Sequence, residues 1–174
     1  SAIAEEFRFE GNEILILENG NKIKSENGAK IISSDDIIIT SQKFEYDKIK
    51  NYLFLEENIK VDDQKNQTII LADKVFYNRL KEEIISSGYT EIMVNNSYTI
   101  KTESIRFDRK KNEIFSETDT SIIDKDKNIL SSKELVLNIN SKVLKAKDVT
   151  IDYVDGSKSS FDSFFGDLNS KKFL

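Results

Sequence analysis

The sequence predicts an all-β protein: an antiparallel meander, built from two-strand repeats of about 30 residues, that folds over on itself into a sandwich or a semi-open roll. In most segments apolar and polar residues alternate with a period of two, which is typical of strands with one buried face. Polar turns that open with Asp or Asn separate these segments at regular intervals, because both side chains can bond their own backbone two residues on. The chain has no proline and only 6 glycines, so few positions force a break in a strand.

The repeat is anchored by an apolar-x-apolar step that ends in an aromatic residue or leucine. The anchors are Tyr46, Tyr77, Phe107 and Leu137, at steps of 31, 30 and 30 residues. A divergent leading copy surrounds residues 7–12, and a trailing copy begins near residue 164. A fixed period of this size indicates stacked copies of one supersecondary unit, so we expect an antiparallel meander of about 9–12 strands.

The elements of the repeat follow one another in a constant order. Leading strands are expected over 44–48, 75–79, 105–109 and 135–139. Polar connections follow them over 47–51, 78–82, 108–112 and 138–142. Second strands are expected over 53–61, 84–94 and 114–122, and second turns over 62–66, 95–97 and 124–128. The whole chain, 1–174, is expected to be one domain, in which 157–174 form an edge strand or a frayed tail.

The alternation turns one apolar face of every strand toward a common interior. The candidate interior residues are Ile39, Phe44, Tyr46, Leu53, Leu55, Ile59, Ile70, Val75, Tyr77, Ile84, Ile92, Ile105, Phe107, Ile114 and Ile122. A packed core alone explains such a set. Small polar residues such as Ser86, Thr102 and Ser116 interrupt the inner rows, and they favour an internal groove because they fill less volume.

A meander that does not close into a barrel has two free edges, which natural proteins either block or use to add a partner's strand. Aromatic residues mark both ends of this chain: Phe7 and Phe9 at the start, and Phe164, Phe165 and Phe173 at the end. Two interpretations stay open for these residues, a packed cap and a partner edge.

The composition argues against most chemistry. Histidine and cysteine are absent, which excludes histidine triads, thiol nucleophiles, Cys/His zinc sites and disulfides. The 26 Lys and Arg are scattered and outnumbered by 31 Asp and Glu, which argues against a nucleic-acid partner. The run Asp124-x-Asp126-x-Asn128 opens like a calcium loop, but Ile129 and Leu135 occupy the positions that require Gly and Glu. We therefore expect no enzyme activity, no metal and no cofactor.

One repeat resembles a known family. The stretch Ala72-Asp73-Lys74-Val75-Phe76-Tyr77-Asn78 is similar to the signature of OstA-like domains, the periplasmic domains of lipopolysaccharide-transport proteins. Segments 53–59 and 84–90 match in part the sequence that follows this signature in the family. The late stretches 126–135 and 143–149 look more like the N-terminal periplasmic domain of LptD than like LptA, the second choice. The resemblance covers about residues 30–155.

The resemblance implies a twisted, semi-open β-jellyroll fold, and it also implies a function. Family members stack strand to strand into a periplasmic bridge that leads toward the outer membrane, with lipid A acyl chains in an apolar groove between the sheets and the sugars outside. It therefore implies lipopolysaccharide as ligand, other jellyroll domains as partners by strand addition, and a location on the periplasmic side of the outer membrane. The outer-membrane barrel that follows this domain in LptD is absent from this chain, which implies an excised domain or a stand-alone relative.

Two other functions remain as alternatives. The first is a structural β-repeat interaction module without lipid cargo. Side chains would fill the interior of such a module, whereas a lipid-conducting domain would have an open, apolar groove between its sheets. The second is a polysaccharide-cleaving enzyme, which needs two inward carboxylates; the pattern shows no such pair.

Overall fold

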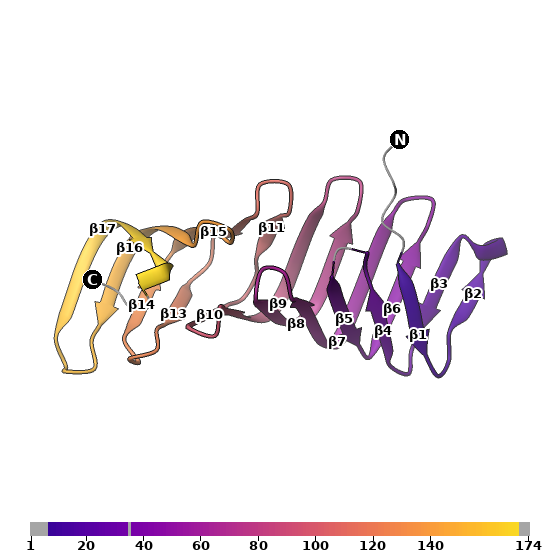
Figure 1. Cartoon of the computed structure of the whole chain (residues 1–174), viewed down its shortest axis with the longest axis horizontal. Coiled ribbons are helices and arrows are strands. Elements are labelled where there is room, and N and C mark those ends of the chain that lie inside the picture. The colour runs from indigo at the N-terminus through magenta and orange to yellow at the C-terminus, as the bar shows by residue number, and fades with distance from the viewer. Residues whose placement is uncertain (1–6, 35, 171–174) are drawn as a thin grey trace.

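The computed structural model describes residues 7–34 and 36–170, and these consist of strands joined by turns (Figure 1). Two short 3-10 helices are the other elements, η1 (Glu18–Gly20) and η2 (Leu168–Ser170). The strands are β1 (Arg8–Gly11), β2 (Leu15–Leu17), β3 (Lys22–Ser25), β4 (Ala29–Ile32), β5 (Ile37–Ser41), β6 (Lys43–Asp47), β7 (Tyr52–Asp63), β8 (Thr68–Asn78), β9 (Glu83–Val94), β10 (Tyr98–Thr102), β11 (Arg106–Asp108), β12 (Glu113–Ser116), β13 (Thr120–Ile123), β14 (Ile129–Ser132), β15 (Glu134–Asn138), β16 (Val143–Asp152) and β17 (Lys158–Asp167).

The strands form successive passes across the molecule, and each pass pairs antiparallel with the next pass along the chain. Six passes bend in the middle and are divided into two strands, as in β3 with β4 and β10 with β11, whereas β7, β8, β9, β16 and β17 each make a whole pass. The all-β antiparallel fold class with two-strand repeats, predicted from the alternation, is confirmed.

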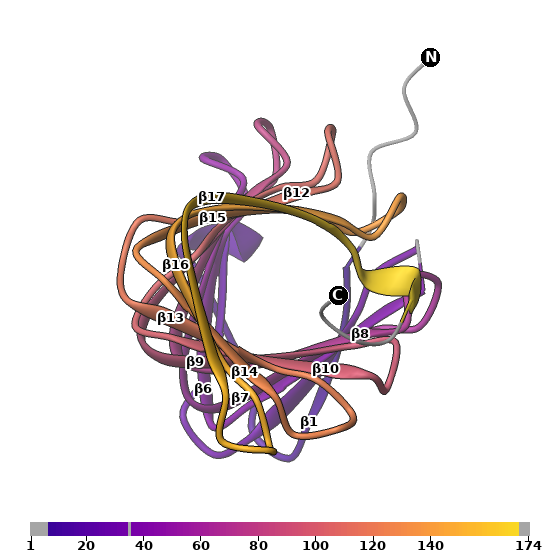
Figure 2. The same cartoon turned by 90° about the vertical axis from the view of Figure 1, so that its left-hand side faces the viewer.

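The bends fold the meander into two layers that face each other. Layer one contains β2, β3, β6, β11, β12 and β15 with the adjoining halves of the long strands, and layer two contains β1, β4, β5, β10, β13 and β14 with the other halves. Seen along its length, the molecule is a roll (Figure 2). Within the described residues, β1 pairs only with β4, β2 only with β3 and β17 only with β16, so the roll has two free edges.

Irregular residues mark the bends in the long strands. The register between β7 and β8 shifts between Glu56 and Ile59, and that between β8 and β9 shifts between Ala72 and Lys74. Glu57 and Gly88 have φ angles of 63° and 78° at these places. An extra residue increases the local bend, so these bulges turn β7, β8 and β9 from one layer into the other. The sequence led us to expect a bulge near Lys74 or near Lys147: the register shifts beside Lys74, whereas the register between β16 and β17 runs past Lys147 without a shift.

The turns at the free rim of layer one share one hydrogen bond, which explains why Asp or Asn opens each of them. The Asp47 carboxylate accepts a bond from the Lys50 backbone N–H at 2.9 Å. The same bond recurs in the three later turns, from Lys81 to Asn78, from Lys111 to Asp108 and from Ser141 to Asn138. Side-chain capping of this kind fixes the turn locally, so the connections repeat with the strands.

Candidate functional site

The fifteen predicted interior residues lie together between the two layers. Each is at most 6% exposed, and all belong to one continuous hydrophobic core. Leu53, Ile92, Ile114 and Ile122 are completely buried within it. The structure thus collects these residues, from β5 to β13, into one apolar interior that their own side chains fill.

Several polar interior residues at the bends bond one another, whereas the buried hydroxyls of Ser41 and Ser132, at the ends of β5 and β14, have no hydrogen-bond partner among the described residues. The hydroxyls of Ser86 and Thr90 lie 2.7 Å apart. The hydroxyl of Ser116 lies 3.0 Å from that of Thr102 and 2.9 Å from that of Thr120. These small residues were expected to border an internal groove. In the structure, hydrogen bonding where the passes bend accounts for them.

The free rims of the two layers face each other along a line that we call the mouth of the roll. Lys142, in the turn between β15 and β16 on the rim of layer one, donates a hydrogen bond of 3.2 Å to the backbone oxygen of Asn66. Asn66 lies in the turn between β7 and β8, on the rim of layer two. Burial lowers the pKa of Lys142, and the nearby Asp63 carboxylate partly opposes this shift. The contact therefore joins the two layers across the mouth.

A second contact crosses the mouth near the start of the chain. Phe7 precedes β1 in layer two, and its ring centroid lies 5.6 Å from that of Tyr46 and 6.0 Å from that of Tyr77, both in layer one. The guanidinium carbon of Arg79 lies 4.5 Å from the centroid of the Phe7 ring. An aromatic ring between a cation and other rings is a favourable arrangement, so Phe7 covers the interior at this end.

Arginines that sequence reasoning missed hold two of the anchor residues. Arg79 donates a hydrogen bond of 2.7 Å to the Tyr46 hydroxyl, and Arg109 donates one of 2.6 Å to the Tyr77 hydroxyl. Each arginine directly follows the Asn or Asp that opens a rim turn. Recurrence of arginine at this place in two successive repeats is the signal that could have revealed its role.

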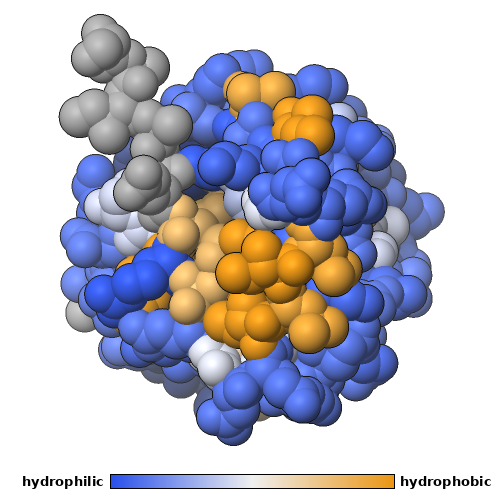
Figure 3. Space-filling view, turned by 90° about the vertical axis from the view of Figure 1, so that its right-hand side faces the viewer, coloured by the Kyte–Doolittle hydropathy of each residue, from blue (hydrophilic) through white to orange (hydrophobic). Residues whose placement is uncertain are grey.

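The two free edges carry exposed apolar residues. In β2, Leu15, Ile16 and Leu17 are all exposed, and Ile16 is 69% exposed. Figure 3 shows apolar residues gathered on the end of the molecule that carries β1 and β2, within a polar surround. These three residues were not predicted, although three consecutive apolar residues break the alternation and could have indicated a special strand.

The predicted edge residues lie at or next to the edge strands. Phe9 is in β1, and Phe164 and Phe165 are in β17. Phe7, Phe9 and Phe164 are half-buried against the core, whereas Phe165 is exposed. Phe173 lies outside the described residues.

The part of the chain that the structure describes contains no group of three acidic residues placed to hold a metal ion. No helix in it is long and apolar enough to cross a membrane.

Comparisons with known proteins give a structural match only. No model of a known protein family matches the chain, and no curated protein sequence matches it. The chain is similar in structure to LptH from Pseudomonas aeruginosa, the LptA homologous periplasmic component of the conserved lipopolysaccharide transport device. The two are 15% identical, the match covers 76% of this chain and 94% of LptH, and the TM-score is 0.54. At this identity the similarity establishes a shared fold.

Proposed function

We propose that this chain is a lipopolysaccharide-transport domain that takes lipid A acyl chains between its two layers and passes them toward the outer membrane. The observation that carries the proposal is the continuous apolar interior of a roll whose end strands each pair on one side only. The likeness in fold to a component of a lipopolysaccharide transport device supports it. The role is binding and transfer without catalysis or a cofactor, in the periplasm.

Acyl chains suit such an interior because they need apolar surface and little specific contact. Each buried CH₂ group contributes about 0.8 kcal/mol, so a few acyl chains bind usefully once the layers have moved apart. The mouth is the entry that leaves a polar head group in water. Entry then requires the contacts of Phe7 with Arg79 and of Lys142 with Asn66 to separate.

Partner domains join through the free edges. β17 at one end and β1 with β2 at the other offer unpaired backbone groups and exposed apolar side chains to an added strand. Because the two edges differ, such contacts run head to tail and extend a chain of domains. Within this function, the late repeats favour a role like that of the N-terminal domain of LptD, ahead of an outer-membrane barrel, over that of LptA.

Site-specific photo-crosslinking tests the proposal with matched pairs of neighbouring isoleucines. Ile70 and Ile122 face the interior, whereas Ile69 and Ile123 are the adjacent residues on β8 and β13 and face outward. A photoreactive residue at each position, with lipopolysaccharide added and light applied, should give lipid adducts at 70 and 122 only. Equal adducts at both members of each pair, or none in folded protein, would contradict the proposal.

A specific observation favours the alternative, a structural β-repeat module without lipid. The interior residues are tightly packed, with no more than 6% exposure. The absence of interior adducts, together with head-to-tail association through the edge strands, would establish that module instead.

A further inference from the structure

Outward-facing apolar residues of layer one line up across the strands. Phe54 pairs with Phe76, and Phe76 pairs with Ile85 on the next strand. The register continues through five further strands to residues of the same face, Arg106, Phe115, Val136, Lys145 and Phe165. We call this row the outer stripe. It crosses eight strands at about 4.8 Å per strand, and so extends over roughly 34 Å.

The outer stripe is hollowed at its aromatic end. A hollow of about 490 Å³ has Phe54, Phe76 and Ile85 in its lining. The centroids of the two phenylalanine rings lie 4.9 Å apart, and the Tyr52 ring stands edge-on to Phe76 at 5.0 Å. A second hollow, of about 530 Å³, lies farther along the same row and is lined in part by Val136, Lys145 and Phe165. Between them, the Arg106 guanidinium covers the Phe115 ring at 4.2 Å.

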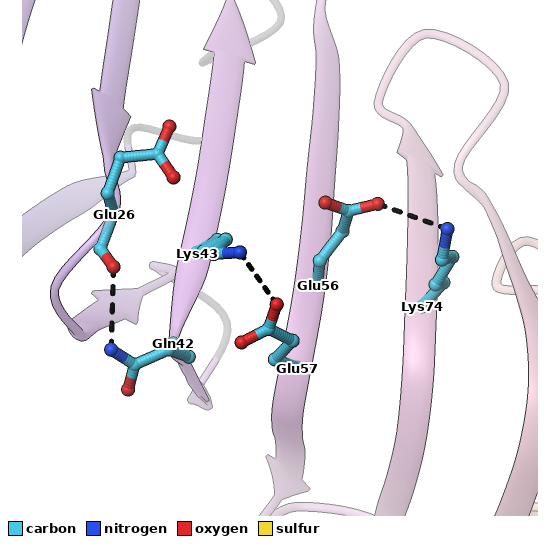
Figure 4. Close-up of polar contacts among 6 residues, drawn as sticks. All are labelled: Glu26, Gln42, Lys43, Glu56, Glu57 and Lys74. Carbon is cyan, nitrogen blue, oxygen red and sulfur yellow. Dashed lines mark hydrogen bonds and ion pairs between the residues drawn. The ribbon is translucent and has the colours of Figure 1, made fainter.

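Charged side chains in balanced numbers surround the first hollow. Its lining includes three lysines and three glutamates: Lys24, Lys43, Lys74, Glu26, Glu45 and Glu56. Figure 4 shows two ion pairs that the lining lysines make, one between Lys74 and Glu56 at 3.3 Å and one between Lys43 and Glu57, a residue outside the lining, at 2.6 Å. Because the cations and carboxylates compensate one another, the rim presents hydrogen-bond donors and acceptors without a net charge.

We propose that the outer stripe binds an uncharged saccharide chain that lies across the strands of layer one. A sugar ring has an apolar C–H face, which suits the electron-rich faces of Phe54 and Phe76. Its hydroxyls both donate and accept, which matches a rim of alternating ammonium and carboxylate groups. The balanced charge disfavours a polyanion, and the polar rim disfavours a wholly apolar occupant.

This site is separate from the acyl-chain site of the proposed function. Phe54 and Phe76 alternate with Leu53, Leu55, Val75 and Tyr77, which are buried in the interior, so the outer stripe lies on the opposite side of layer one. A saccharide can bind there whether or not lipid enters the interior. Adducts at Ile70 and Ile122 test the interior, and they do not depend on the outer stripe.

Titration of the full chain with saccharides, followed by amide NMR, tests the inference. The probes are uncharged hexasaccharides of glucose, galactose and mannose, with octaethylene glycol monododecyl ether, an uncharged detergent whose head group contains no sugar, as the apolar competitor. Phe54→Ala is compared with Phe161→Ala, because both phenylalanines are 45% exposed and Phe161 lies on β17 away from the outer stripe. Both variants are first shown to melt cooperatively.

We expect at least one hexasaccharide to cause saturable changes in the NMR chemical shifts of the amides around Phe54, Phe76 and Ile85. Phe54→Ala should weaken this binding about tenfold or more, and Phe161→Ala should leave it within about twofold. The inference is overturned if no hexasaccharide binds, if both variants bind equally well, or if only the detergent shifts these amides. The inference is also overturned if the amide signals around Phe54, Phe76 and Ile85 disappear when the protein concentration is raised without any saccharide. In that case a second copy of the chain would occupy the outer stripe.

Discussion

Arg79 donates a hydrogen bond of 2.7 Å to the hydroxyl of Tyr46, which lies 33 residues earlier in the chain. One repeat thereby holds the anchor residue of the repeat before it, and Arg109 does the same for Tyr77. The backbone repeats this relationship, since the N–H groups of Arg79 and Arg109 donate to Asn51 and Glu82 in the preceding rim turns. Contacts between neighbouring repeats therefore stabilise the rim of layer one as well as the core.

Removing the Tyr46 hydroxyl should weaken this link between repeats. Tyr46→Phe keeps the buried ring and takes away the acceptor for Arg79, whose guanidinium can still reach water. We expect the free energy of unfolding to fall by about 1 kcal/mol, measured by urea denaturation. Tyr52→Phe is the control, because the Tyr52 hydroxyl makes no hydrogen bond among the described residues, and its effect should stay within about 0.5 kcal/mol. Equal effects of the two changes would contradict the link.

The interior could be predicted from the sequence because alternation is a local property. Tyr46, Tyr77 and Phe107 were placed in the interior by the alternation alone, and all three are buried; Leu137, the fourth anchor of the repeat, is buried as well. Successive residues of a strand point to opposite faces, so a residue's position along its own strand decides whether it points inward. The neighbouring strand with which it pairs has no influence on this. The prediction therefore needed no knowledge of the three-dimensional pairing.

The mouth and the outer stripe could not be predicted in this way. Lys142 and Asn66 are 76 residues apart and meet only because the bends bring the two rims together. The outer stripe takes Phe54, Phe76 and Phe115 from different strands, at spacings set by the lengths of bulges and turns. Strand register decides which outward residues become neighbours, and it depends on the long-range pairing of the whole meander.

A cavity in the centre of the core should be costly. Ile114 is fully buried, so Ile114→Ala removes packing from both layers and should lower the free energy of unfolding by about 2–5 kcal/mol. Ile49→Ala is the matched control, because Ile49 is 70% exposed and its truncation should cost less than about 0.5 kcal/mol. Thermal and urea denaturation of both variants measure the difference. Similar costs at the two sites would mean that the interior is already loosely packed.

The bulge at Gly88 should tolerate alanine worse than a free turn does. Gly88 and Gly156 have φ angles of 78° and 88°, so a Cβ at either site costs about 1 kcal/mol of backbone strain. At Gly88 the new Cβ would also lie 2.9 Å from an Asp73 carboxylate oxygen, whereas nothing lies within 4 Å at Gly156. That oxygen accepts the Tyr89 N–H at 3.1 Å. We therefore expect Gly88→Ala to lower the free energy of unfolding by about 1 kcal/mol more than Gly156→Ala, and equal losses would show that Asp73 moves aside freely.

Lys142 should make stability depend on alkaline pH. Burial lowers the pKa of Lys142 below its ordinary value of 10.5, although Asp63 partly opposes the shift. Below the folded pKa both states carry the proton, and the partly buried cation weakens the fold. Between the folded pKa and 10.5 the unfolded chain retains a proton that the folded chain has released, so stability rises with pH in this window.

Two replacements that do not titrate isolate this effect. Lys142→Met removes the charge at every pH, and Lys142→Arg keeps it at every pH because arginine does not lose its proton in proteins. The free energy of unfolding of the natural chain, relative to either variant, should therefore increase as the pH rises from neutral toward 10.5. Urea denaturation of the three proteins across that range measures the two differences, natural chain minus Lys142→Met and natural chain minus Lys142→Arg. Plotted against pH, the two differences should have the same slope, although the two variants differ in charge. A flat or falling difference would show that Lys142 stays hydrated, and that its contact with Asn66 does not close the mouth.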